Sequence, residues 1–60
     1  MEKVVNLPIN TKFSYDGNHY LKVVEFKGKV GSWEFMYNCI RLKEYEDKFI
    51  HDDTVVEREE

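Results

Sequence analysis

The stretch "FSYDGNHY", residues 13 to 20, carries the strongest local structural signal in the chain. Asp16-Gly17 separates two alternating segments. A two-residue type I′ turn needs a positive φ at both central residues, which glycine adopts freely and aspartate tolerates. Such a turn pairs Tyr15 with Asn18 and Phe13 with Tyr20. Because opposed side chains share a face of the sheet, we expect one surface to be lined by Phe13, Tyr15, Tyr20, Val24 and Phe26.

The size of the chain limits how much core it can build. Sixty residues form at most one domain, and a domain this small buries only about 60% of the surface that its unfolded chain exposes. Small domains usually add disulfides, a metal or a partner subunit. Cys39 is the only cysteine, and no C-x-x-C or H-x-x-x-H pair begins a zinc site. Oligomerisation or docking on a partner is the remaining route.

Composition and charge narrow the class of protein. The chain is 42% hydrophobic and 15% aromatic, which is typical of a folded domain, and no run approaches the length of a membrane span. A lone thiol without a targeting segment predicts a cytoplasmic protein. The net charge of −3 divides into +2 for residues 1–30 (five bases, three acids) and −5 for residues 31–60 (four bases, nine acids). This balance disfavours a general nucleic-acid binder.

The first two thirds of the chain are predicted to form strands. "VVNLP" is a short apolar run that ends at Pro8, and "HYLKVVEF" is the strand that returns from the Asp-Gly turn. "KGKVGS" contains two glycines and is predicted to be a loop. In "WEFMYNCIRL" the residues Trp33, Phe35, Tyr37 and Cys39 share one face. We expect that face to be buried, with Trp33 either in the core or at an interface.

The last third leaves alternatives open. Leu42, Tyr45 and Phe49 have the spacing of a helix face, but the same residues also fit two strands that turn near residues 46 and 47. Residues 48–57 are predicted to form a hairpin with Asp52-Asp53 at its tip, and residues 57–60 a frayed tail. The predicted fold is therefore all-β: one domain over residues 1–60, an antiparallel meander of four to five strands curled into a partly open barrel. A ββαβ arrangement, with one short helix near residues 42–47, is the alternative.

Residues 7–25, "LPINTKFSYDGNHYLKVVE", resemble a loose group of small proteins encoded by phages and mobile elements. The matching positions are Pro8, Thr11, Phe13, Tyr15, Gly17, Tyr20, Val23, Val24 and Glu25. Asn10 stands where the group usually has glycine. Members often carry a cysteine cluster after this hairpin, and only Cys39 is present here, so no metal or disulfide role is carried over. The resemblance implies a phage accessory protein rather than a particular activity.

No residue set predicts catalysis. Cys39 is expected to lie on an apolar face, which makes a thiol inert, although pairs with His19 or His51 are conceivable. Asp52-Asp53 lacks the loop pattern of a calcium site, and no phosphate-binding, hydrolase or zinc-protease motif occurs. We therefore expect a protein that is not an enzyme and that binds no cofactor and no metal.

Binding to a protein fits more of these observations. Nine aromatic residues are too many for so small a core, and aromatic side chains dominate protein interfaces. We expect a binding module that inhibits a host defence or nucleic-acid-handling protein through Trp33, Tyr37, Tyr45, Asp47, Asp52 and Asp53. One alternative is a barrel that binds single-stranded nucleic acid through Tyr15, Tyr20, Lys22, Lys27 and Lys29. Another is a subunit that assembles with itself, as a homo-oligomer.

Overall fold

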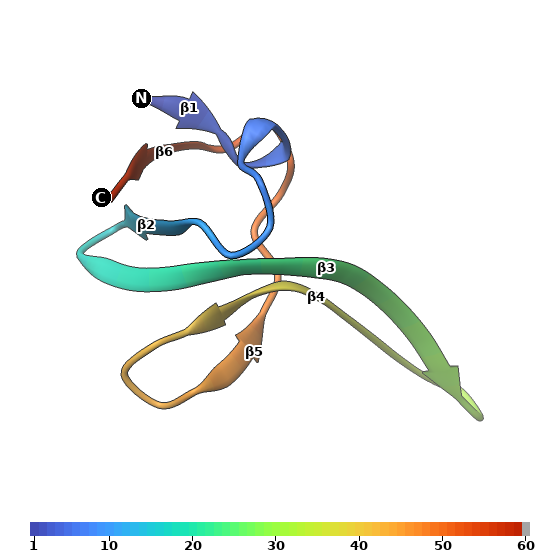
Figure 1. The fold of residues 1–60 in the computed structure, drawn as a ribbon. Coiled ribbons are helices and arrows are strands. Elements are labelled where there is room, and N and C mark those ends of the chain that lie inside the picture. Colours follow the sequence, from blue (N-terminus) through green and yellow to red (C-terminus); the bar gives the residue numbers. More distant parts are fainter. Residues whose placement is uncertain (60) are drawn as a thin grey trace.

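A computed structural model describes residues 1–59, and their strands form one open antiparallel sheet (Figure 1). The elements in chain order are β1 (Glu2–Lys3), a single 3-10 turn η1 (Val4–Asn6), β2 (Lys12–Tyr15), β3 (Asn18–Val30), β4 (Trp33–Arg41), β5 (Glu46–Lys48) and β6 (Val55–Arg58). The strand order is β1-β6-β2-β3-β4-β5. The all-β prediction is confirmed, and the sheet is not closed, as in a partly open barrel. The sheet has six strands rather than four or five.

The hairpin of β2 and β3 has the predicted register. Tyr15 lies opposite Asn18, and Phe13 lies opposite Tyr20. Asp16 and Gly17 have φ values of 51° and 79°, as a type I′ turn requires. The Phe13 and Tyr20 rings stack with centroids 5.4 Å apart, and both side chains are buried. This hairpin supplies the two largest side chains of the core.

The C-terminal third differs from the predicted hairpin of residues 48–57. β5 pairs with β4, whereas β6 pairs with β1 and β2, so Phe49 and Ile50 have no strand partners in β6. Asp52 and Asp53 do form a turn, closed by a 2.9 Å hydrogen bond from the Thr54 amide to the His51 carbonyl. The prediction was wrong because the chain crosses over the sheet after β5 instead of folding back on it.

The structure also decides the predictions for residues 42–47 and for the C-terminal tail. Residues 42–45 form a turn that leads into β5, so the alternative with a helix is wrong. Of the predicted frayed tail, residues 57 and 58 lie in β6, and the Glu59 amide donates a 2.9 Å hydrogen bond to the Lys12 carbonyl. Position 60 lies outside the described residues. At the other end of the chain, "VVN" forms η1 rather than a strand.

The core lies where β1, β6, β2 and the first half of β3 meet the end of β4. Its buried apolar residues are Val4, Leu7, Phe13, Tyr20, Cys39, Ile50 and Val56. Two polar side chains are buried with them and are hydrogen-bonded, as buried polar groups must be. Lys22 Nζ donates to the Val4 carbonyl at 2.7 Å, and Asn38 bonds both the amide and the carbonyl of Ile50.

A register shift in β3 separates this core from a projecting arm. Lys22 lies opposite Cys39 and Phe26 opposite Tyr37, so three residues of β3 face the single residue Asn38. Beyond the shift, β3 and β4 leave the rest of the sheet together (Figure 1). We call residues 26–37 the arm. It makes the molecule elongated, with extents of 39, 23 and 19 Å.

Two predictions about β3 are wrong, and the open question about Trp33 is decided. Val24 and Phe26 are exposed and do not extend the surface of Phe13 and Tyr20, because the irregular segment redirects β3 away from the core. "KGKVGS" is mostly strand, and only Gly31 and Ser32 form the turn at its end. Trp33 is 69% exposed, so it does not belong to the core. No helix in residues 1–59 is long and apolar enough to span a membrane.

Candidate protein-binding surface

One face of the arm carries a continuous row of aromatic rings. The pairing places Phe26 opposite Tyr37, Gly28 opposite Phe35 and Val30 opposite Trp33. Ring centroids are 5.5 Å apart for Phe26 and Tyr37, 5.7 Å for Phe26 and Phe35, and 5.6 Å for Trp33 and Phe35. We call Phe26, Trp33, Phe35 and Tyr37 the aromatic face. Its rings pack on one another rather than on the core, so much of their apolar surface stays in contact with solvent.

Gly28 makes the close packing of these rings possible. A Cβ atom at this position would lie 2.5 Å from the Phe35 ring and 2.7 Å from the Phe26 ring. No real side chain tolerates such contacts, so the two rings occupy the space above the glycine backbone. Gly28 was predicted to lie in a loop. It lies within β3 instead, and its missing side chain leaves room for the two rings.

A hollow of about 420 Å³ adjoins the aromatic face and is lined by Trp33, Phe35, Met36, Tyr37 and Asp47. Odd-numbered residues of β4 point to one side of the sheet and Met36 points to the other. The lining includes Asp47 and no residue of β3, so the hollow lies along the edge of β4 away from β3. Asp47 comes from β5, which pairs with β4 only from Cys39 to Arg41. The hollow thus follows β4 beyond the end of β5.

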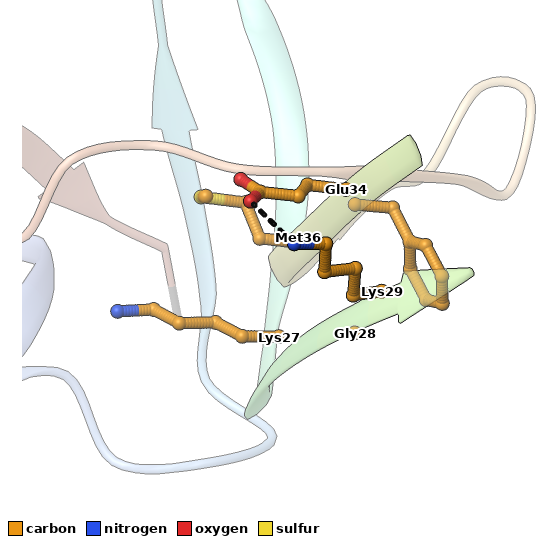
Figure 2. A pocket seen from close by; sticks show the side chains of 6 residues that line it. Lys27, Gly28, Lys29, Glu34 and Met36 are labelled. Atoms are coloured by element: carbon orange, nitrogen blue, oxygen red, sulfur yellow. Dashed lines mark ion pairs between the residues drawn. The ribbon is translucent and has the colours of Figure 1, made fainter. Parts of the chain in front are cut away.

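The opposite face of the arm has a different character. Figure 2 shows Lys27, Lys29, Glu34 and Met36 around a second hollow of about 270 Å³, whose lining also includes Gly28 and Phe35. The Lys29 ammonium lies 4.0 Å from the Glu34 carboxylate, and both side chains are mostly exposed. An exposed pair of this kind contributes little to stability, about 0 to 1 kcal/mol. The face is polar and contains both signs of charge.

The structure brings together half of the residues predicted to bind a partner. Trp33, Tyr37 and Asp47 line the hollow at the edge of β4. Tyr45 lies in the turn before β5, where it is 80% exposed and has a φ of 54°. The two remaining aspartates belong to the crossing segment near β1. The Asp52 carbonyl accepts a bond from the Val5 amide, and Asp53 lies 3.8 Å from Lys3.

The residues predicted to bind single-stranded nucleic acid do not form one platform. Tyr20 and Lys22 are buried, and the Lys22 ammonium is engaged by the Val4 carbonyl. Tyr15 lies at the β2–β3 turn, whereas Lys27 and Lys29 lie in the arm. The two arm lysines also point away from the aromatic face, since they alternate with Phe26 and Gly28 along β3. Burial thus removes Tyr20 and Lys22 from any exposed platform for a nucleic acid.

The titratable groups near Cys39 form no reactive pair. Burial raises the pKa of the Cys39 thiol to about 11, and the nearby Lys22 ammonium opposes that rise. The Sγ atom is 3.5 Å from the Lys48 carbonyl. His19 contacts Glu59 at 2.7 Å, and the His51 ring accepts a hydrogen bond from the Asp53 amide. Across residues 1–59, no group of three or more His, Cys, Asp or Glu side chains is arranged to hold a metal ion.

Sequence reasoning missed three residues of this surface: Phe26, Phe35 and Met36. Phe26 and Phe35 were assigned to buried faces because alternating apolar residues usually mark a core-facing strand, and Met36 was given no role. The available signal was the ratio of aromatic residues to chain length, which already showed that a small core could not cover them all. No protein-family model, curated protein or solved structure matches this chain.

Proposed function

We propose that this protein is a non-catalytic binding module that docks on a host protein through the aromatic face of its arm. The observation that carries this proposal is the exposure of Trp33 within a packed row of rings. Tryptophan, tyrosine and phenylalanine are enriched in the centres of protein interfaces, and a few such residues supply most of the binding energy. The rings are already ordered by mutual packing, so binding costs little additional side-chain entropy.

The charges around the aromatic face favour a basic partner. Asp47 borders the hollow, and within residues 1–59 its carboxylate has no hydrogen bond and no ion pair. Glu44 and Glu46 lie on the adjoining turn and strand, where they already pair with Arg41 at 3.1 Å and with Lys48 at 3.3 Å. A lysine or arginine side chain of the partner would therefore complement Asp47, and such opposite charges accelerate association. A groove that normally holds DNA or RNA has this character.

The most specific form of the proposal is a phage accessory protein acting in the host cytoplasm. By occupying a basic groove, it would inhibit a host defence or nucleic-acid-handling enzyme. The resemblance of residues 7–25 to small phage proteins supports this setting, and the acidic border of the aromatic face supports the choice of target. No chemistry on the partner is required, since occupation alone blocks access.

The test compares capture of bacterial proteins by the native chain and by two variants. Trp33→Ala removes the most exposed ring of the aromatic face. The control, Tyr15→Ala, removes an exposed ring of β2 beside the turn that leads into β3. Truncation of a central aromatic anchor costs about 2 kcal/mol or more, so retention should fall at least about tenfold for Trp33→Ala. Retention by Tyr15→Ala should match the native chain.

The captured protein then provides the functional readout. Its activity should fall when the native chain is added and should be unaffected by Trp33→Ala, and double-stranded DNA or heparin should compete for the same site. Equal retention by both variants would contradict the proposed surface. Binding of a labelled single-stranded oligonucleotide that is lost in Tyr15→Ala and weakens steeply with salt would instead support the nucleic-acid alternative.

A further inference from the structure

One edge of β4 is unpaired along the arm. β4 pairs with β3 from Arg41 to Trp33, but β5 covers its other edge only from Cys39 to Arg41. At Asn38 the side chain bonds the backbone of Ile50, where the chain turns away. From residue 33 to residue 37, no strand within the described part of the chain pairs with this edge. Figure 1 likewise shows β3 and β4 projecting alone.

This edge lacks the features that keep monomeric sheets apart. Edge strands are usually blocked by lysine, proline, bulges or short length. The five residues from 33 to 37 contain one charge, Glu34, with no lysine and no proline, and the irregular segment lies in β3 instead. The hollow of about 420 Å³ lies along the same edge and is lined mainly by apolar side chains. The edge is thus able to accept a further strand.

We propose that a second copy of this chain pairs with this edge, antiparallel, about a two-fold axis at Phe35. The five open residues then match five open residues of the second copy. Trp33 lies opposite Tyr37 of the second copy, Glu34 opposite Met36 of the second copy, and Phe35 opposite itself. Two aromatic faces join on one side of a four-stranded sheet formed by both arms.

Charge and symmetry select a second copy over an unrelated strand. In this register Glu34 faces an uncharged side chain rather than its own copy, and Lys29 of the same chain lies 4.0 Å from it. Aromatic pairs directly across antiparallel strands are favourable. A two-fold contact also closes on itself, because it pairs the β4 edges of both copies with each other. The outer edge of β3 in the arm stays unpaired by any strand of residues 1–59, and Lys27 and Lys29 lie on that strand, where lysine discourages further pairing. The small core also favours dimerisation, because domains of this size commonly rely on a partner subunit for stability.

The dimer uses the same edge of β4 as the hollow of the proposed binding surface, but it is detected by mass rather than by capture of a host protein. Sedimentation equilibrium of the purified chain should show a species of twice 7.3 kDa that dissociates on dilution. A chain that stays at 7.3 kDa up to millimolar concentration would overturn the proposal. That result would also follow if the edge were reserved for a strand of another protein.

Two substitutions of Met36, one to a negative and one to a positive side chain, test the register of the proposed dimer. Met36 is 44% exposed and lies opposite Lys27 within its own chain and opposite Glu34 of the second copy in the proposed dimer. Met36→Glu places a carboxylate beside Lys27 but against Glu34 of the second copy, so the dimer dissociation constant should rise about tenfold. Met36→Lys should lower that constant, although the new ammonium faces Lys27 within the chain.

The two variants therefore separate folding from dimerisation. Met36→Glu should leave the monomer as stable as the native chain or slightly more so, while weakening the dimer. Ile9→Glu and Ile9→Lys make the same chemical changes at an exposed loop position outside the arm and should leave the dissociation constant unchanged. A dimer that responds to Ile9 as it does to Met36, or that ignores both Met36 variants, would place the interface elsewhere and overturn the proposal.

Discussion

Lys22 illustrates how a charged side chain can lie inside so small a domain. It is only 9% exposed, and its ammonium donates a 2.7 Å hydrogen bond to the Val4 carbonyl. A long aliphatic stem can cover apolar surface while the charged end is hydrogen-bonded. The residue joins β3 to η1 and at the same time lies opposite Cys39, whose ionisation it favours. Asn10 adopts a φ of 72°, a conformation that is accessible to asparagine and glycine.

Cys39 provides a prediction at this scale. Its pKa of about 11 lies two units above the ordinary value of 9.0, because burial disfavours the thiolate more than Lys22 favours it. Thiolate is the reactive form, so alkylation by iodoacetamide near neutral pH should be about a hundredfold slower than for an unperturbed thiol. The rate should keep rising with pH until about 11. Rapid alkylation of the folded chain near neutral pH would show that Cys39 is accessible and ionised.

Two two-residue hairpin turns have different geometries and different roles in the fold. Both Asp16 and Gly17 have positive φ values, whereas in the turn of Gly31 and Ser32 only the glycine has one. Gly17 and Gly31 both have positive φ values, 79° and 60°, and neither has an atom within 4 Å of the position that a Cβ would occupy. A substitution at either position is therefore opposed by backbone strain alone. The first turn joins the strands that carry Phe13 and Tyr20 into the core, whereas the second closes the end of the arm.

This difference predicts unequal effects of the same substitution. Gly17→Ala should lower the free energy of unfolding by about 1 kcal/mol, because the strained turn belongs to the unit that unfolds cooperatively. Gly31→Ala should change global stability much less and should instead speed hydrogen exchange of the arm amides. Chemical denaturation and native-state exchange measure the two effects. Equal losses of global stability would show that the arm and the core unfold as one unit.

At the scale of the whole molecule, the crossing segment of residues 49–54 decides the strand order. It carries the chain from β5, at one edge of the sheet, to β6, between β1 and β2. Asn38 anchors this segment through bonds of 2.7 and 3.0 Å to the carbonyl and amide of Ile50. Ile50 itself is part of the core. The crossing segment is thus held to β4 by one buried amide side chain and by the burial of Ile50.

Asn38→Leu tests this anchor with a side chain of similar size. It leaves both backbone groups of Ile50 without their partner, and each buried unsatisfied group costs about 1 to 3 kcal/mol. The free energy of unfolding should fall by about 2 to 4 kcal/mol in urea denaturation. Asn6→Leu, at an exposed position, should change it by less than about 0.5 kcal/mol. Comparable losses in the two variants would remove the anchoring role.

Local signals predicted the parts of the fold that depend on neighbouring residues. The Asp16-Gly17 turn, the register of Phe13 with Tyr20 and the all-β character follow from backbone preferences and alternation, which act over a few residues. Of the candidate binding surface, Trp33, Tyr37 and Asp47 were predicted and lie together, whereas Phe26 and Phe35 were assigned to the core. Alternation identifies an apolar face but does not say what covers it.

Only the tertiary structure decided which apolar faces are buried and which strands meet. The irregular segment between Lys22 and Phe26 changes no residue type, yet it moves half of β3 out of the core and exposes a row of aromatic rings. The placement of β6 between β1 and β2 depends on contacts between residues more than 40 positions apart, such as Phe13 with Arg58. Local propensity carries no information at that separation, because the pairing is selected by the packing of the whole sheet.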